Sequence, residues 1–385
     1  MKKTLVLFLF LLMVLFNCSS DNFTKLSSRK GNYPILPDAN IKNIILYIGD
    51  GMGMSQICAA RIKSLGANGK LEIEKMPISG FLNTHSIDQL ITDSAAGATA
   101  LASGVKTRNG MIGVTPDSSA VRTILEAARD MGKSTGLVAT STITHATPAC
   151  FAAHCPSRRD QSTIAEHIIK SKVNVILGGG KQFFTPNSVE GSLRSDNKNL
   201  IDQAISDGYL FVENYNELQL ADKEFVLGLF ELGPLNPGAQ KPGLLEMTEK
   251  AIQLLERNKD GFFLVVEGSQ IDWGGHDNDI NYVVEEQLHF DEAIKAGLEF
   301  AAKDKHTLIV VTADHETGGL HCRQGSVDGK QMQVTWSTGG HTGEPVPIFA
   351  FGPYAHRFTG AMDNTEVPKI FADLWGVIEF PQKLN

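Results

Sequence analysis

Residues 43–51 read Asn-Ile-Ile-Leu-Tyr-Ile-Gly-Asp-Gly, and this stretch sets the expected architecture of the chain. An apolar run that ends in a Gly-Asp-Gly turn is typical of a buried strand in a parallel sheet. Comparable runs recur at 136–139, 173–177, 262–266, 308–312 and 347–351. Helical patterns lie between the runs, most clearly at 247–255 and 283–298. We therefore expect an α/β fold with a mainly parallel central sheet and helices on both faces.

Chemically active side chains follow three of these expected strands. Asp50 follows the first strand, and Glu267 and the pair Asp314–His315 each follow a later one. Because ligands of parallel sheets bind beyond the carboxyl ends of the strands, these side chains should converge at one edge of the sheet. Burying several carboxylates without partners is unfavourable, so their convergence indicates cation binding.

Two further segments carry candidate metal ligands. Asp272 and His276 stand four residues apart, a spacing that places both side chains on one face of a helical turn. His341 lies in the segment Gly-Gly-His-Thr-Gly. Carboxylate and imidazole ligands without thiolates suit a catalytic zinc ion, which keeps one coordination position open.

Residues 144–148, Thr-His-Ala-Thr-Pro, and Arg158 carry groups that suit a phosphate and a hard cation. The planar fork of an arginine holds two phosphate oxygens at once. A hydroxyl such as that of Thr147 can ligate a hard cation or position its water. Alone, these residues would be interpreted as a loop and a solvated face.

Residues 92–100 read Thr-Asp-Ser-Ala-Ala-Gly-Ala-Thr-Ala, so Ser94 precedes a run of small residues that favours helix. A serine in the first turn of a helix lies beside free backbone N–H groups, which attract anions. Its hydroxyl can attack a bound phosphate group if a neighbour activates it. The alternative is an ordinary N-cap serine, and this segment alone favours that alternative.

Together these segments resemble the alkaline phosphatases. The matching motifs are Gly-Asp50-Gly-Met-Gly, Asp93-Ser94-Ala-Ala-Gly-Ala-Thr-Ala with Gly104-Val-Lys-Thr, Thr147-Pro148 before Arg158, Val-Glu267-Gly with Ile-Asp272 and His276, Thr312-Ala-Asp314-His315-Glu-Thr-Gly-Gly, and His341-Thr-Gly. They extend over residues 43–353 in the family's order. The resemblance implies the family's three-layer sandwich and the hydrolysis of phosphate monoesters to an alcohol and inorganic phosphate.

The resemblance also implies a phosphoserine intermediate at Ser94 and three metal ions, two of zinc and one of magnesium. One zinc would be held by Asp272, His276 and His341. The second zinc would bind the oxygen of Ser94 and would be held by Asp50, Asp314 and His315. The magnesium would be held by Asp50, Thr147 and Glu267. The phosphate would be held by Arg158.

Two residues depart from the best-known bacterial pattern of the family. His145 stands where an aspartate is common, so zinc is expected to compete with magnesium at the third site. Trp273 stands where a lysine is common, and its lack of charge implies weaker binding of product phosphate.

Other functions would share parts of this pattern. A phosphodiesterase or a sulfatase of the same superfamily would share the metal-binding strand ends, but commonly uses a threonine or a modified cysteine or serine as nucleophile. Ser94, Arg158, Thr147 and Glu267 favour phosphate monoesters as substrates. A non-catalytic exported lipoprotein that binds metal or phosphate would lack the nucleophile, which this chain retains.

Composition and the N-terminal segment indicate where the protein acts. The 385 residues carry a net charge of −8. The sequence has no stripe of basic residues of the kind that nucleic-acid binding needs, so we expect no nucleic-acid partner. We expect a signal peptide at 1–18 of the lipoprotein type with Cys18 lipidated, a linker at 19–40, and one catalytic domain at 41–385. The protein would then be exported to the periplasm or cell envelope. We expect the other four cysteines to be free, buried thiols, and the protein to be a homodimer.

Overall fold

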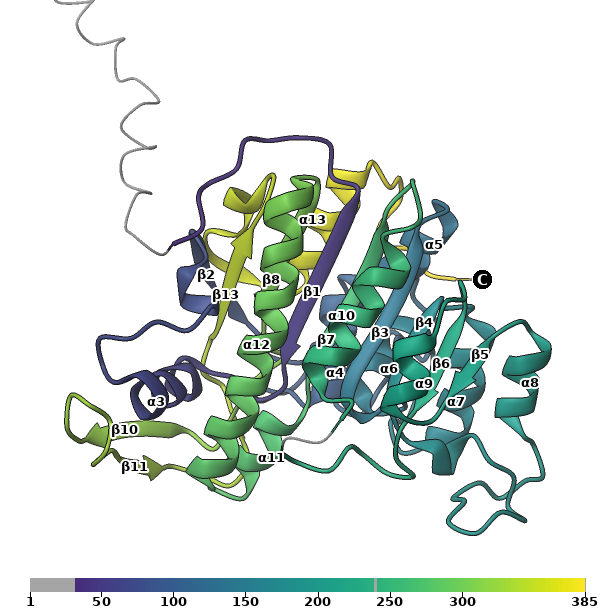
Figure 1. Ribbon diagram of the computed structural model, residues 1–385, viewed down its shortest axis with the longest axis horizontal. Helices are drawn as coiled ribbons and strands as arrows, with labels where there is room; N and C mark the ends of the chain where they lie inside the picture. The colour runs from purple at the N-terminus through teal and green to yellow at the C-terminus, as the bar shows by residue number, and fades with distance from the viewer. Residues whose placement is uncertain (1–31, 239–240, 385) are drawn as a thin grey trace, which may run out of the picture.

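The computed structural model describes residues 32–238 and 241–384 (Figure 1). The expected signal peptide, the lipidation site Cys18 and the first part of the expected linker lie outside the described residues. Within the described residues, no helix has the length and apolar character needed to cross a membrane.

A ten-stranded sheet forms the centre of the molecule, in the strand order β14-β2-β13-β8-β1-β7-β3-β4-β6-β5. The strands of this sheet are β1 (Asn43–Gly49), β2 (Ile78–Asn83), β3 (Ser134–Thr142), β4 (Val175–Gly179), β5 (Leu210–Val212), β6 (Val226–Leu229), β7 (Phe262–Gly268), β8 (Thr307–Thr312), β13 (Val346–Phe351) and β14 (Gly360–Asp363). Two small antiparallel pairs lie outside it: β9 (Glu316–Thr317) with β12 (His341–Thr342), and β10 (Leu320–Gln324) with β11 (Gln333–Trp336).

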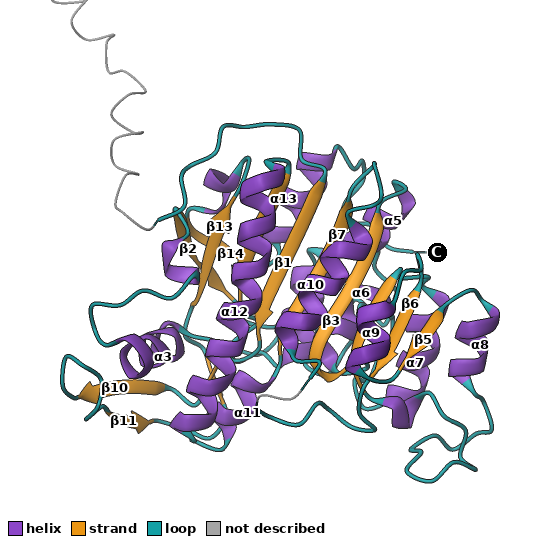
Figure 2. Cartoon of the chain, viewed as in Figure 1, coloured by secondary structure: helices purple, strands orange, loops and turns teal. Residues whose placement is uncertain are grey.

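Helices cover both faces of the sheet, with α10 and α12 in front and α6 and α13 behind in the view of Figure 2. The α-helices are α3 (Met54–Leu65), α4 (Ser94–Ser103), α5 (Ile124–Asp130), α6 (Ala146–Ala152), α7 (Gln161–Lys170), α8 (Leu200–Ser206), α9 (Tyr215–Leu220), α10 (Leu244–Leu255), α11 (Gln270–His276), α12 (Ile280–Asp304) and α13 (Glu366–Trp375). Short 3-10 helices occur at Ile73–Lys75, Lys181–Phe183 and Ala355–Phe358. The expected α/β sandwich is confirmed.

Strand β1 lies in the middle of the sheet and is buried along its whole length. It pairs in parallel with β7 on one side and with β8 on the other. Its residue Ile48 is in register with Glu267 on β7 and with Thr312 on β8. The residues that follow these three strands therefore emerge side by side at one edge of the sheet, as the sequence predicts.

All six expected strands and both expected helices are present, with boundaries shifted by a few residues. The strand at 347–351 is β13, which runs antiparallel to β8 and β2, so the sheet is mixed although mostly parallel. Residues 200–231, which carry no recognisable motif, form α8, β5, α9 and β6 at the far edge of the sheet.

The four cysteines of the described chain carry free thiols, as expected. Cys150 and Cys155 are buried, whereas Cys58 and Cys322 are only half-buried. The expectation of burial is therefore wrong for Cys58 and Cys322, because α3 and β10 lie at the periphery rather than in the central core.

Candidate active site

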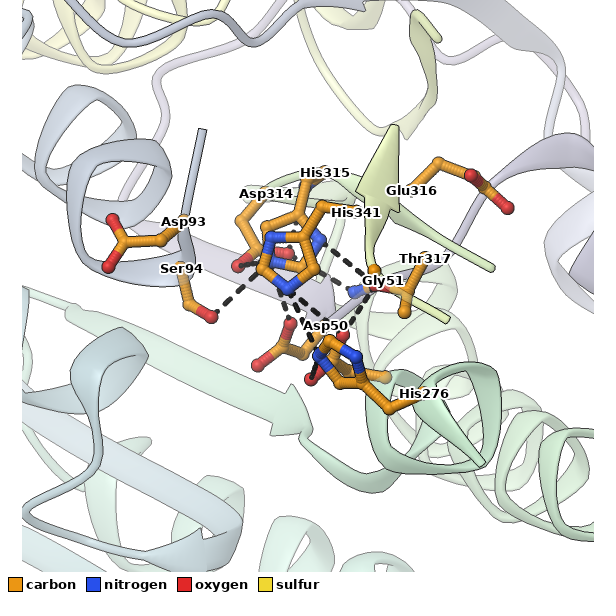
Figure 3. Close-up of polar contacts among 12 residues, drawn as sticks. Asp50, Gly51, Asp93, Ser94, His276, Asp314, His315, Glu316, Thr317 and His341 are labelled. Carbon is orange, nitrogen blue, oxygen red and sulfur yellow. Dashed lines mark hydrogen bonds and ion pairs between the residues drawn. The ribbon is translucent and has the colours of Figure 1, made fainter. Parts of the chain in front are cut away.

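The edge of the sheet formed by β1, β7 and β8 holds the candidate site (Figure 3). Asp50 directly follows β1, is fully buried, and its N–H donates to the carbonyl oxygen of Gly268 on β7 at 3.1 Å. The next residue, Gly51, has a φ of +74°, and a Cβ there would lie 2.7 Å from Cα of Asp272. Only glycine permits this turn, which brings β1 and α11 close together.

Ser94 is the first residue of α4, as the sequence predicts. Asp93 caps the helix by accepting a hydrogen bond from Ala96 N at 2.9 Å. The Ser94 hydroxyl lies 3.3 Å from Nε2 of His315 and points toward the buried carboxylates (Figure 3). Gly97 lets α4 approach, because a Cβ at that position would lie 2.9 Å from the carbonyl oxygen of Asp314. The nucleophile candidate thus faces the strand ends.

One cluster of possible metal ligands consists of Asp50, Asp314 and His315, all fully buried. Nε2 of His315 lies 3.4 Å from Asp50 Oδ1 and 3.3 Å from Asp314 Oδ2. Burial and the nearby carboxylates raise the pKa values of Asp50 and Asp314. Burial, followed by the proximity of other imidazoles, lowers the pKa of His315, so that its ring is neutral and able to ligate a cation.

A second cluster brings together Asp272 and His276 from α11 with His341 from β12. Nε2 of His276 lies 3.3 Å from Asp272 Oδ2 and 3.2 Å from Nε2 of His341. Nδ1 of His276 lies 2.8 Å from the carbonyl oxygen of Gly339, and Nδ1 of His341 lies 2.9 Å from that of Thr92. A carbonyl oxygen accepts, so each Nδ1 donates and each Nε2 is left to bind a cation.

A third group, Asp50, His145 and Glu267, adjoins the first cluster through Asp50. Oε2 of Glu267 accepts from Ser269 Oγ at 2.6 Å and from Ser141 Oγ at 3.2 Å, which fixes the carboxylate. Burial raises the pKa of Glu267 to about 7. Burial and then the charge of Arg158 lower the pKa of His145 to about 4, so the imidazole is neutral at neutral pH.

Buried polar atoms without hydrogen-bond partners concentrate at this edge of the sheet. Those at this edge are Asp50 Oδ1 and Oδ2, Glu267 Oε1, Asp314 Oδ2, Thr147 Oγ1 and His145 Nδ1, and the remaining ones are scattered over Arg61, Gln287, Asn364 and Trp375. Leaving so many buried oxygens unpaired is strongly unfavourable, whereas divalent cations satisfy them. The donor set, oxygens and imidazoles without thiolates, fits zinc and magnesium.

Arg158 lies beside this group and close to the start of α4. Its Nη1 donates to Asp93 Oδ2 at 3.0 Å, and its Nη2 lies 3.1 Å from Nε2 of His145. Trp273 on α11 packs edge-on against His145, with ring centroids 6.3 Å apart. The guanidinium is therefore held between Asp93, the residue before Ser94, and His145 of the third group.

Thr317 also belongs to the site, although the sequence singles it out only as part of the motif that runs from Asp314 to Gly319. Its hydroxyl donates to Asp272 Oδ1 and lies 3.2 Å from Nδ1 of His315. It therefore connects ligands of the first and second clusters. The neighbouring Glu316 points away from the clusters (Figure 3) and accepts from Gln56 Nε2 at 2.7 Å.

Comparison with known proteins identifies the family. The sequence model of the alkaline phosphatase family matches residues 41–332 and 327–376. Alkaline phosphatase 3 of Bacillus subtilis is 37% identical, over 93% of this chain and 92% of that protein. Alkaline phosphatase of Escherichia coli is 34% identical, over 86% of this chain and 85% of that protein.

The solved structures agree with the sequences. The alkaline phosphatase of the Antarctic bacterium TAB5 has a TM-score of 0.80 and 35% identity, over 87% of this chain and 98% of that chain. Both the fold and the sequence similarity extend over the strand ends that hold the clusters described above. The chain belongs to the alkaline phosphatase family and is a metal-dependent phosphomonoesterase.

Proposed function

We propose that the chain hydrolyses phosphate monoesters through a covalent phosphoserine at Ser94, with two zinc ions and one magnesium ion. The observation that carries the proposal is the position of the Ser94 hydroxyl. It lies at the first residue of α4, 3.3 Å from His315 and facing the unpaired buried carboxylates. The serine is not needed as the helix cap, because Asp93 already caps α4.

The ligands are assigned to three sites. Asp272, His276 and His341 hold one zinc. Asp50, Asp314 and His315 hold the second zinc. Asp50, Thr147 and Glu267 hold the magnesium, with His145 beside them. When bound, such ions lower the pKa of a nearby hydroxyl or water and stabilise negative charge on phosphate oxygens.

The chain's own groups orient the substrate. Arg158 places two N–H groups against two phosphate oxygens, and Asp93 holds its guanidinium in position. The Ser94 oxygen attacks phosphorus, the bond from phosphorus to the ester oxygen breaks, and the alcohol leaves with a proton. Water then attacks the same phosphorus, and inorganic phosphate is released as Ser94 regains its proton.

The substrate class can be tested with the purified chain in zinc and magnesium at mildly alkaline pH. A chromogenic phosphate monoester, the matching diester and the matching sulfate ester are compared by kcat/KM. We expect the monoester to be preferred by at least about 100-fold, because the diester presents only two free oxygens and the sulfate ester carries one negative charge fewer toward Arg158 and the cations. A preference for the diester or the sulfate ester would reject the monoesterase assignment. Bound zinc without any turnover would point to a binding protein.

An imidazole at the third site favours zinc more than an aspartate carboxylate would, so the presence of His145 bears on which metal binds there. Two TAB5 alkaline phosphatase variants, in which a histidine is replaced by glutamate or aspartate, are described with Mg bound in the M3 site. We infer that His145 plays the corresponding part here and lets zinc compete at the third site.

Replacement of His145 by aspartate should shift the metal content from zinc toward magnesium. Elemental analysis after dialysis against both metals should show about one fewer zinc and one more magnesium per chain, because a carboxylate favours the harder cation. His289→Asp provides the matched control, since His289 lies on α12 and takes part in none of the three groups. Unchanged metal content in His145→Asp would reject this role.

Export, lipidation of Cys18 and a homodimer are part of the same proposal. They rest on the N-terminal sequence pattern and on the family. Labelling with a radioactive fatty acid in the producing cells tests the anchor, and sedimentation of the purified chain tests the dimer.

A further inference from the structure

Helix α3 and the hairpin of β10 and β11 pack side by side at one corner of the molecule (Figure 1). Hydrogen bonds fix their alignment at both ends. Near the start of α3, Gln56 Nε2 donates to the carbonyl oxygen of Thr317 at 2.9 Å. Beyond its end, Ala67 N donates to the carbonyl oxygen of Val327 at 2.8 Å. The middle of α3 therefore lies against β10.

Cys58 on α3 and Cys322 on β10 occupy these facing positions. Both are half-buried, and both line a surface cavity of about 420 Å³ with Arg61 and His321. Burial, the electrostatic effect of Cys58 and a hydrogen bond with Cys58 raise the pKa of the Cys322 thiol to about 11. Both thiols therefore open onto the same cavity, which exposes them to small reagents.

The other two cysteines of the described residues are arranged differently. Cys150 Sγ lies 3.3 Å from the carbonyl oxygen of Ala95 and is fully buried. Cys155 Sγ contacts the carbonyl oxygen of Ser157 at 3.3 Å and is also buried. Neither lines the cavity that Cys58 and Cys322 share.

We propose that Cys58 and Cys322 form a disulfide that cross-links α3 to the β10–β11 hairpin when a low-molecular-weight disulfide is present. Hydrogen bonds on both sides align the helix with the strand and hold the two cysteines on facing segments. It is independent of the proposed phosphoserine mechanism.

The reaction is two successive thiol–disulfide exchanges. Cys58 attacks first, because its Sγ lies 3.3 Å from the Arg61 guanidinium and an attacking sulfur carries negative charge. It bonds to one sulfur of the small disulfide, and the other sulfur leaves as a thiol. Cys322 then attacks the Cys58 sulfur and releases the second thiol. Two protein thiols are oxidised, and the small disulfide is reduced to two thiols that take up the two protons.

The cross-link would join two segments that directly follow candidate metal ligands. α3 follows the Asp50 turn, and β10 follows His315 and β9. A disulfide between distant residues restricts the unfolded chain and holds both segments together in the folded protein. The oxidised protein should therefore unfold at a higher temperature and lose its metals to a chelator more slowly than the reduced protein.

Peptide mapping of the full chain, loaded with zinc and magnesium, tests the proposal. The protein is equilibrated with oxidised or with reduced glutathione, alkylated and digested with trypsin. The tryptic peptides 43–61 and 306–323 carry Cys58 and Cys322, one each. We expect a linked pair of these peptides after oxidation, a fall in their alkylated forms of about tenfold or more, and a Tm several degrees higher.

Variants separate this cross-link from other oxidation. In Cys58→Ser, peptide 306–323 should be alkylated under both conditions, and the shift in Tm should disappear. Cys155→Ser is the matched control and should keep the linked peptides. If Cys58→Ser does not fold, Cys322→Ser replaces it. The peptide map of the unaltered chain tests the cross-link without either variant. Full alkylation of both peptides after oxidation, or separate glutathione adducts without a link, would overturn the proposal.

Discussion

Replacing Ser94 by alanine should lower kcat/KM for a phosphate monoester by roughly a thousandfold or more. The hydroxyl of Ser94 faces the buried carboxylates from the first turn of α4, and no other serine or threonine hydroxyl is proposed to receive the phosphoryl group. Alanine is compatible with the helix start, and Asp93 still caps it. The protein should therefore keep its fold and its metals while losing turnover.

The matched control for Ser94→Ala is Ser103→Ala at the other end of the same helix. Ser103 is buried, and its hydroxyl bonds only to the carbonyl oxygen of Thr99, so its loss should leave turnover within about twofold. Acid quenching of the unaltered enzyme with labelled substrate should trap phosphate on the peptide that contains Ser94. Rapid turnover by Ser94→Ala with unchanged kcat would exclude the phosphoserine route.

Removing the metals should both stop turnover and destabilise the fold. Each ion bound at 1,000 times its Kd stabilises the native state by about 4 kcal/mol, so loss of several ions should lower Tm by roughly 10 °C or more. Activity should fall at least about 100-fold on treatment with EDTA and return when zinc and magnesium are added. Differential scanning calorimetry and kinetics on the same sample measure both effects.

The stability of the metal-free protein should also depend on pH in a defined direction. Burial raises the pKa of Glu267 to about 7 and that of Asp314 to about 8. A raised carboxyl pKa stabilises the folded state fully below the ordinary value near 4, and this contribution is lost as the pH rises through 7 to 8. The EDTA-treated protein should therefore have a higher Tm at pH 6 than at pH 9. An equal or higher Tm at pH 9 would contradict the clustering of unpaired carboxylates.

Apolar runs predict the individual strands because buried parallel strands are apolar on both faces. The position after a strand then predicts that Asp50, Glu267 and Asp314 meet, and the structure confirms this convergence. A run of apolar residues carries no direction, however. The antiparallel orientation of β13 therefore depends on its tertiary pairing with β8 and β2 and was not predicted.

Contacts between side chains from separate segments could not be predicted from spacing alone. Thr317 bonds to Asp272 and His315 because β9 pairs with β12 next to α11, an arrangement that local sequence does not encode. The approach of Cys58 to Cys322 depends in the same way on the packing of α3 against β10. Motif residues were predictable because the family resemblance supplied their partners.

The central position of β1 has a consequence for how the protein is made. Both partners of this strand, β7 and β8, are synthesised long after it, at Phe262–Gly268 and Thr307–Thr312. Pairing over such a separation is slow, because the entropy of closing a long loop is lost before the stabilising contacts between the strands form. In the nascent chain, neither edge of β1 can pair with its partner strand until the last third of the chain has been synthesised. A chain in that state has no assembled catalytic centre, because the residues that follow β7 and β8 are not yet beside Asp50.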